Sequence, residues 1–204
     1  MLCERGRAML LYDITREMFS APVYPGDPKP RRTLLHAIGE DSLYNQTQLE
    51  LSAHTGTHID APLHFDEEGA DIGSLKLTKF YGKCTVVTIS GILTGEDMER
   101  LLPHCTKRLI LHGSGKAFLS VSAARVIADS KLVLVGTDAV SIAPPFDEAA
   151  PHQELARAGV IVLEGLFLEG VEDGEYTLAA FPLKMSGLEA SPCRAVLMRE
   201  PKGY

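Results

Sequence analysis

The sequence predicts an α/β protein with a largely buried sheet. Short apolar segments recur along the chain with helix-like segments between them, which is the pattern of strands that alternate with helices. The chain has 204 residues, of which 45% are hydrophobic, so it can bury a complete core. No run of proline, glycine or serine resembles a linker. We therefore expect residues 1–204 to form a single domain.

The predicted strands are apolar stretches bounded by turn-forming or polar residues. They cover residues 9–13, 47–53, 84–89, 108–111, 132–135, 160–163, 176–181 and 195–198. The predicted helices cover residues 96–102, 122–129 and 152–158. Thr94 can cap the first helix together with Asp97, three residues further on. Gly159 is placed to end the third helix, because glycine readily adopts the left-handed conformation that often follows one.

The proline-rich segment SAPVYPGDPKP, residues 20–30, predicts stiff chain without regular structure. Such a segment can hold Tyr24 in a fixed place beside a binding site. The alternative is an ordinary surface turn, and composition alone does not separate the two.

The charge of the chain disfavours a nucleic-acid partner. Its formal net charge is −7, whereas binding to phosphates needs a basic face. The apolar runs KLVLVG and VIVL are far too short to span a bilayer, and charges interrupt the N-terminus where a secretory segment would be apolar. The four cysteines form no CxxC pair, so neither a zinc knuckle nor a small disulfide scaffold is indicated. We expect a cytoplasmic protein with reduced thiols and no membrane partner.

One segment, HTGTHIDAPLH, concentrates coordinating side chains and predicts a metal site. It contains His54, His58, Asp60 and His64. Imidazole and carboxylate together suit zinc, manganese or iron(II). The alternative is a row of polar residues on a solvated strand. A further alternative is that Asp60 does not bind the metal and instead orients a histidine that does.

The spacing within this segment favours an extended chain. A helix turns about 100° per residue, so positions 60 and 64 would point away from position 54. In a strand all four side chains share one parity and can project to the same side. Pro62 cannot donate a ladder hydrogen bond, so we expect a strand end or edge that breaks into a loop.

Further ligands are expected from a later helix and strand, because an ion must be enclosed from more than one side. His152 opens the third predicted helix, and Glu164 directly follows the buried run VIVL. The outward and return paths are of similar length, on the order of 10 Å, so both side chains should end at the same edge of the sheet. Asp138 is a weaker candidate.

The segment from His54 to His64 resembles the HxGTHxDxPxH signature of the metal-dependent cyclase family, which includes bacterial kynurenine formamidase and isatin hydrolase. Every specified position of the signature is present. The segments YDIT, PVYPGDP, HQELARAGVIVLEGL and FPLKMSGLEASPCRA also resemble family segments in the same order. The resemblance implies a layered β/β/α swivelling domain, found as a homodimer or a higher oligomer.

The resemblance also implies roles for the candidate residues. Two ions per subunit, zinc or manganese, would be bound by a set that comprises His54, His58, Asp60, His152 and Glu164. Asp60 would be able to bridge them. His64 would be the catalytic proton-transfer residue, and Tyr24 would line the pocket of a small aromatic amide substrate.

Two positions depart from the family. Formamidases commonly carry tryptophan where this chain has Tyr24, and asparagine frequently follows the glutamate where this chain has Gly165. The first change bears on stacking against an arylamine. The second removes a polar neighbour of Glu164.

The expected activity is therefore metal-dependent hydrolysis of a carbon–nitrogen amide bond, with N-formylkynurenine as the foremost substrate. Three alternatives stay open. The same site could open an isatin-like lactam, it could act on another substrate of the family, including dehydration of a hydroxy-acid, or the protein could be a metal-dependent binding module without turnover.

Overall fold

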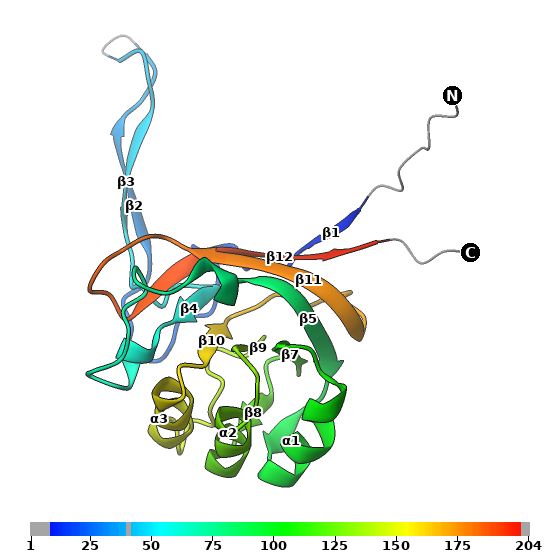
Figure 1. Ribbon diagram of the computed structural model, residues 1–204. Coiled ribbons are helices and arrows are strands. Elements are labelled where there is room, and N and C mark those ends of the chain that lie inside the picture. The colour runs from blue at the N-terminus through cyan, green and yellow to red at the C-terminus, as the bar shows by residue number, and fades with distance from the viewer. Residues whose placement is uncertain (1–8, 40–41, 201–204) are drawn as a thin grey trace, which may run out of the picture.

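The computed structural model describes residues 9–39 and 42–200, and its centre is one large mixed sheet. The strand order is β1-β12-β11-β5-β7-β9-β10-β4, and β4 also pairs with β12. The strands are β1 (Leu10–Asp13), β4 (His58–Asp60), β5 (Tyr81–Thr88), β7 (Arg108–His112), β9 (Leu134–Thr137), β10 (Ile161–Glu164), β11 (Gly174–Pro182) and β12 (Ala190–Arg199). Because β4 joins β10 to β12, the sheet curls round and closes on itself (Figure 1).

The sheet combines a parallel and an antiparallel part. Strands β5, β7, β9 and β10 are parallel neighbours, whereas β11, β12, β1 and β4 pair in antiparallel fashion. The short strand β4 therefore lies between the last parallel strand and the C-terminal strand. This position brings the signature segment next to the carboxyl end of β10.

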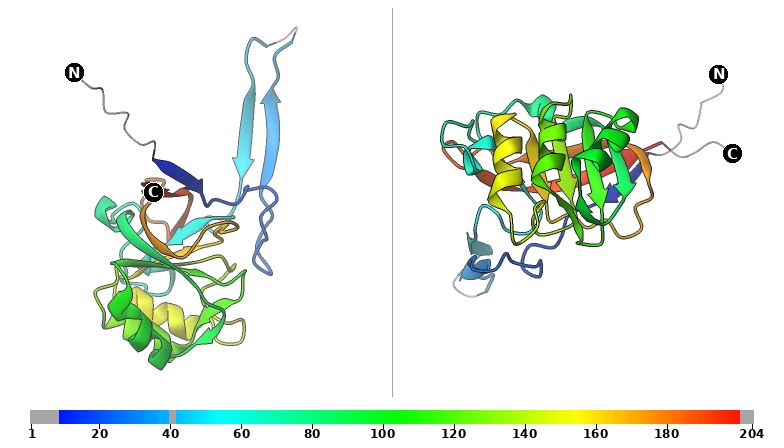
Figure 2. Two further views of the ribbon diagram at one scale, coloured as in Figure 1. Left: turned by 90° about the vertical axis from the view of Figure 1, so that its right-hand side faces the viewer. Right: turned by 90° about the horizontal axis from the view of Figure 1, so that it is seen from below.

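Three helices cover the outer face of the parallel strands and lie side by side (Figure 2). They are α1 (Gly95–Leu101), α2 (Val121–Ala128) and α3 (Ala149–Arg157). The capping box of Thr94 and Asp97 at the start of α1 is confirmed, and Gly159 follows α3 with a φ of 67°, as expected.

The hydrophobic core has two parts, one on each face of the parallel strands. Successive side chains of a strand point to opposite faces. In β7, Ile110 packs inside the closed sheet with Ile59 and Tyr176, whereas Leu109 and Leu111 pack against the helices. All of these side chains are fully or almost fully buried. Burial on both faces explains why the parallel strands read as continuous apolar runs in the sequence.

A long hairpin projects away from this body (Figures 1 and 2). It consists of β2 (Arg31–His36) and β3 (Gln46–Glu50), and every described residue of both strands is exposed. The remaining elements are short. They are the parallel pair β6 (Gly91–Leu93) and β8 (Ala117–Leu119) and the 3₁₀ helices η1 (Pro62–His64), η2 (Leu77–Lys79) and η3 (Leu102–His104).

The mixed α/β fold with a sheet-dominated core confirms the predicted class, with some differences in the elements. Each predicted strand and helix overlaps an observed one, but β2, β6 and β8 were not expected. The stretch 47–53 forms an exposed hairpin strand that ends at Glu50, not a strand of the main sheet. Helix α3 begins at Ala149, so His152 lies inside the helix instead of opening it. Among the described residues, no helix is long and apolar enough to cross a bilayer.

Candidate metal centre and substrate pocket

The signature segment changes conformation along its length. His58 and Asp60 lie on β4 and share one face of it, while Ile59 between them points into the core. This part agrees with the expected extended arrangement. The expectation is wrong for His54 and His64, which lie in a turn before β4 and at the end of η1. Gly56, with a φ of 66°, and Pro62 at the start of η1 break the strand on either side.

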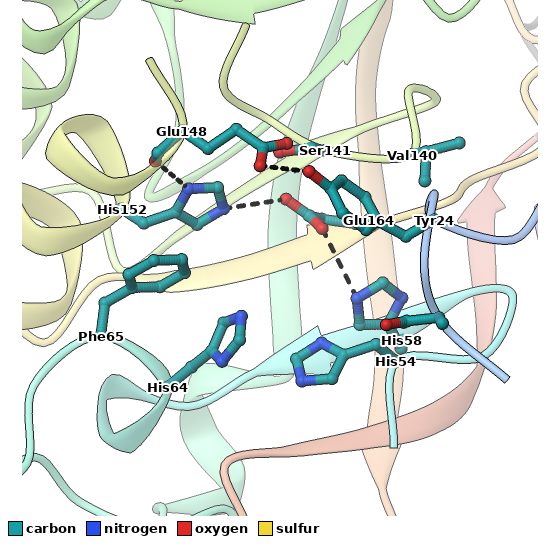
Figure 3. A pocket seen from close by; sticks show the side chains of 11 residues that line it. Tyr24, His54, His58, His64, Phe65, Val140, Ser141, Glu148, His152 and Glu164 are labelled. Atoms are coloured by element: carbon teal, nitrogen blue, oxygen red, sulfur yellow. Dashed lines mark hydrogen bonds and ion pairs between the residues drawn. The ribbon is translucent and has the colours of Figure 1, made fainter. Parts of the chain in front are cut away.

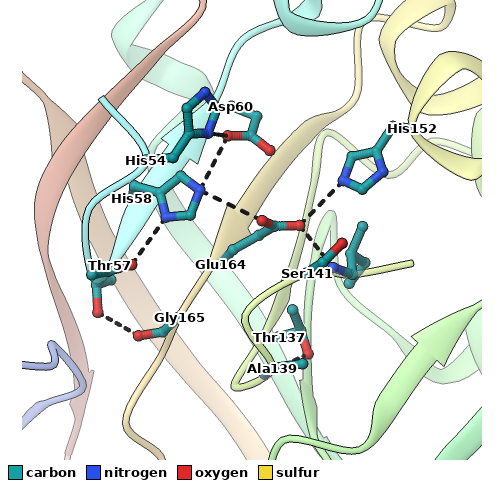
Figure 4. A network of polar contacts seen from close by, with 12 residues as sticks. His54, Thr57, His58, Asp60, Thr137, Ala139, Ser141, His152, Glu164 and Gly165 are labelled. Carbon is teal, nitrogen blue, oxygen red and sulfur yellow. Dashed lines mark hydrogen bonds and ion pairs between the residues drawn. The ribbon is translucent and has the colours of Figure 1, made fainter. Parts of the chain in front are cut away.

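The side chains nevertheless converge, as the sequence predicted. Asp60 Oδ1 lies 3.0 Å from His54 Nδ1 and 3.3 Å from His58 Nε2 (Figure 4). The ring of His64 approaches the ring of His54 with 4.3 Å between centroids. The turn before β4 and the helix η1 therefore bring His54 and His64 close to the other side chains, although neither residue lies on a strand.

Strand β10 and helix α3 supply the other two predicted side chains. Antiparallel pairing sets Glu164 opposite His58. One carboxylate oxygen, Oε1, lies 3.3 Å from His152 Nε2, and the other, Oε2, lies 3.5 Å from His58 Nε2. Glu164 is the last residue of β10, and the helix that carries His152 leads into this strand. The carboxyl end of a parallel strand is where α/β proteins usually place a site.

Glu164 has a fixed orientation although glycine follows it. The backbone amide of Ile142 donates to Glu164 Oε1 at 2.7 Å. Gly165 has a φ of 65°, and a Cβ there would lie 2.3 Å from the carbonyl oxygen of Gly56. Its own carbonyl accepts a hydrogen bond of 2.6 Å from Thr57 Oγ1. Glycine at this position therefore lets the end of β10 cross close to the signature segment.

The centre buries two carboxylates beside three imidazoles. Asp60 and Glu164 are each only 4% exposed. Burial alone would raise the pKa of Asp60, but the imidazoles of His58 and His54 hold it well below its usual value. Burial would lower the pKa of His152, but the Glu164 carboxylate outweighs it and raises this pKa to about 9. The cluster therefore favours positive charge next to its carboxylates, which either protons or a metal cation can supply.

Three buried polar atoms of this centre indicate a site for a metal cation. His58 Nε2 and both carboxylate oxygens of Asp60 have no hydrogen-bond partner among the described residues. Buried polar atoms are normally satisfied, and an unsatisfied one calls for an explanation such as an ion. The donor side chains form two groups, and within each group the donor atoms all lie within 4.8 Å of one another. One is His54, His58 and Asp60, the other is Asp60, His152 and Glu164, and Asp60 belongs to both. These residues fit a divalent metal bound by mixed nitrogen and oxygen ligands.

A cavity of about 250 Å³ is lined by four of these donors, His54, His58, His152 and Glu164 (Figure 3). Its lining residues are Tyr24, Asp27, His54, His58, His64, Phe65, Val140, Ser141, Glu148, His152 and Glu164. Tyr24 lies in a turn of the proline-rich segment, where Asp27 N donates to its carbonyl, and its hydroxyl donates to Glu148. The segment therefore forms a turn, and this turn places Tyr24 at the cavity. His64 belongs to neither donor group.

The structure places two residues at the pocket that the sequence analysis did not identify, and it places one candidate, Asp138, outside the pocket. Phe65 stacks on His152 with 4.5 Å between ring centroids. Glu148 accepts from Tyr24, and its carbonyl faces His152 Nδ1. The carboxylate of Asp138 accepts hydrogen bonds from the amides of Gly113 and Gly115, so it stabilises that loop and does not line the pocket. Phe65 directly follows the signature and could have been found from that adjacency, whereas no local pattern singles out Glu148.

Comparisons with known proteins identify the family of this chain. Residues 12–144, which include the signature segment, match the cyclase family model described as "Putative cyclase". Kynurenine formamidase of Delftia acidovorans is 36% identical over 201 residues, which cover 92% of this chain and 96% of that protein.

Solved structures share the fold. A potential metal-dependent hydrolase with cyclase activity is 33% identical, with a TM-score of 0.80 over 95% of this chain and all of the other. An isatin hydrolase bound to the product analogue thioisatinate is 17% identical and shares the fold, with a TM-score of 0.82 over 95% of this chain and 93% of the other. The extent of these matches leads to one conclusion: the chain belongs to the cyclase family.

Proposed function

We propose that this protein is a metal-dependent amide hydrolase, and specifically an arylformamidase that converts N-formylkynurenine to kynurenine and formate. The proposal depends on one observation: Asp60 is a buried carboxylate without hydrogen bonds in the described part of the chain, and it belongs to two groups of nitrogen and oxygen donors. The other donors of these groups line a cavity together with Tyr24 and Phe65. The similarity to kynurenine formamidase supports the choice of substrate.

The proposed metal ligands would be His54 and His58 for one ion and His152 and Glu164 for the other, and Asp60, which belongs to both donor groups, would be available to both ions. We propose two zinc or manganese ions per chain. When bound, such ions polarise a carbonyl and lower the pKa of water towards about 7, so that a nucleophile is available at neutral pH.

His64 is the proposed proton carrier. Burial lowers the pKa of its imidazole, so the ring is neutral at rest near pH 7 and can accept a proton. It lines the cavity and approaches both His54 and His152, with ring centroids 4.3 and 6.4 Å away. From this position it can take a proton from the attacking water and deliver it to the departing nitrogen of the amide.

The aromatic part of the substrate is proposed to lie between Tyr24 and Phe65. Phe65 is held in place by its stack on His152, and the Tyr24 ring is held by the hydrogen bond from its hydroxyl to Glu148. Tyrosine leaves more room than the tryptophan common in formamidases, so it allows a larger ring or an additional ring substituent.

A second candidate is the opening of a neutral cyclic amide such as isatin. Within the described part of the chain, neither lysine nor arginine lines the cavity to receive a substrate carboxylate. Isatin carries no carboxylate, whereas N-formylkynurenine does. The shared fold with isatin hydrolases is compatible with this alternative.

We also propose that the protein is cytoplasmic and forms a homodimer or a tetramer. The β2–β3 hairpin exposes Leu34, Leu35 and Leu49 and lies apart from the main sheet. An isolated two-stranded hairpin is only marginally stable in water, so coverage by a second copy would stabilise it.

A substrate panel tests the proposed function. Protein loaded with zinc or manganese is assayed on N-formylkynurenine, on N-formyl arylamines without the amino-acid group, and on isatin. We expect turnover of N-formylkynurenine that stops on chelation and returns on addition of the metal. Preference for isatin would favour the second candidate. Fully loaded protein that turns over no amide would contradict both.

A further inference from the structure

The three imidazoles of the proposed metal centre are not held in the same way. His58 Nδ1 lies 3.0 Å from the carbonyl oxygen of Gly56, and His152 Nδ1 lies 2.7 Å from the carbonyl oxygen of Glu148. A carbonyl oxygen only accepts, so in both rings Nδ1 carries the proton. Their Nε2 atoms are then the free nitrogens, and both face the carboxylates of the centre.

His54 is oriented the other way round. Its Nδ1 faces Asp60 Oδ1 at 3.0 Å, and its Nε2 lies 3.3 Å from Glu189 Oε1. In each ring one nitrogen faces away from the carboxylates of the centre. In His54 this nitrogen is Nε2, which lies next to a side-chain carboxylate. In His58 and His152 it is Nδ1, which lies next to a main-chain carbonyl. A carboxylate partner fixes the tautomer of a ligating histidine and makes its free nitrogen more basic.

Glu189 is placed there by the pairing that closes the sheet. It directly precedes β12, and its carbonyl oxygen accepts a hydrogen bond of 2.8 Å from the amide of Ala61. The next residue, Ala190, lies opposite Asp60 in the β12–β4 register. The backbone of Glu189 is thus tied to the signature segment itself, while its side chain stays 38% exposed at the rim of the centre.

We propose that Glu189 is the positioning residue of the metal centre: its carboxylate accepts the Nε2 proton of His54 and thereby makes Nδ1 the ligating nitrogen. This inference rests on the proposed function, because it presupposes that His54 binds an ion. Glu189 acts through His54 and does not itself bind the ion. The tautomers of His58 and His152 are set by main-chain carbonyls, which no side-chain substitution removes. His54 is therefore the one of these three rings whose ligating nitrogen a single side-chain substitution can change.

The first test is metal affinity, measured by competition with a chelator for Glu189→Ala, Glu189→Gln and the control Glu175→Ala, an exposed carboxylate on β11. We expect Glu189→Ala to weaken one of two binding steps by about 10- to 100-fold and to leave the other unchanged. Glu189→Gln should lose less, because its amide oxygen still accepts the proton. The control should match the unaltered protein. Equal affinities in all four proteins would overturn the proposal.

The second test reads the nitrogen directly and separates positioning from a general loss of structure. Long-range proton–nitrogen NMR of the zinc-loaded protein should show His54 protonated on Nε2, with zinc on Nδ1, and the opposite arrangement in His58 and His152. In Glu189→Ala the Nε2 proton of His54 should exchange with water faster. Zinc on His54 Nε2 would overturn the proposal, as would a Glu189→Ala protein that binds one ion fewer at saturation, because Glu189 would then be a ligand. An unaltered protein that binds no zinc would instead contradict the proposed function.

Discussion

Asp60→Ala is expected to remove both metal ions and to lower amide hydrolysis by on the order of 10³-fold or more. Asp60 belongs to both donor groups, and both of its oxygens are buried without hydrogen bonds in the described part of the chain. Its loss therefore opens both ion sites at once, whereas the loss of His152 would open one. Metal content by mass spectrometry and turnover of N-formylkynurenine measure the effect.

Two further variants make the Asp60 result specific. Asp60→Asn keeps the size of the side chain, so it should fold and still lose metal because the bridging charge is gone. Asp138→Asn alters another buried aspartate, whose Oδ1 accepts hydrogen bonds from the amides of Gly113 and Gly115. This variant should keep both ions. A fully loaded Asp60→Ala protein with normal turnover would exclude Asp60 from the centre.

His64→Ala is expected to lower turnover by about 10²-fold or more while both ions stay bound. His64 lines the cavity but belongs to neither donor group, so its removal should leave the ligands intact. What is lost is the imidazole that moves a proton between water and the leaving nitrogen. Turnover and metal content must be measured on the same sample.

The exposed His104, at the end of η3, provides the matched control for this substitution. His104→Ala should retain full turnover and both ions. If the ions leave together with the His64 side chain, His64 is a ligand and its proposed role is wrong. Unchanged turnover of loaded His64→Ala would show that another group carries the proton.

Local sequence signals located most of the elements and the centre. The continuous apolar runs around Ile110 and Val162 mark strands buried on both faces, and the capping pair of Thr94 and Asp97 marks the start of α1. His152 and Glu164 are close in sequence, so the helix-and-strand path predicted that they meet, although α3 begins before His152. The rise per residue of a helix and of a strand sets that distance.

The features that escaped prediction depend on contacts distant in sequence. β4 is short, and its pairing with both β10 and β12 cannot be derived from its own residues. Glu189 reaches His54 only because that pairing closes the sheet. His54 was expected on a strand, yet Gly56 turns the chain and the ring still arrives at Asp60. The hairpin strand β2 is fully exposed, so it lacks the burial pattern that identifies a strand.

Anomalous X-ray diffraction from crystals grown with zinc or manganese would show whether the donors around Asp60 bind two ions. We expect two anomalous peaks per chain near the Asp60 carboxylate, one beside His54 and His58 and the other beside His152 and Glu164. A well-diffracting crystal in which the imidazoles of His54 and His58 turn apart with no ion between them would contradict this expectation.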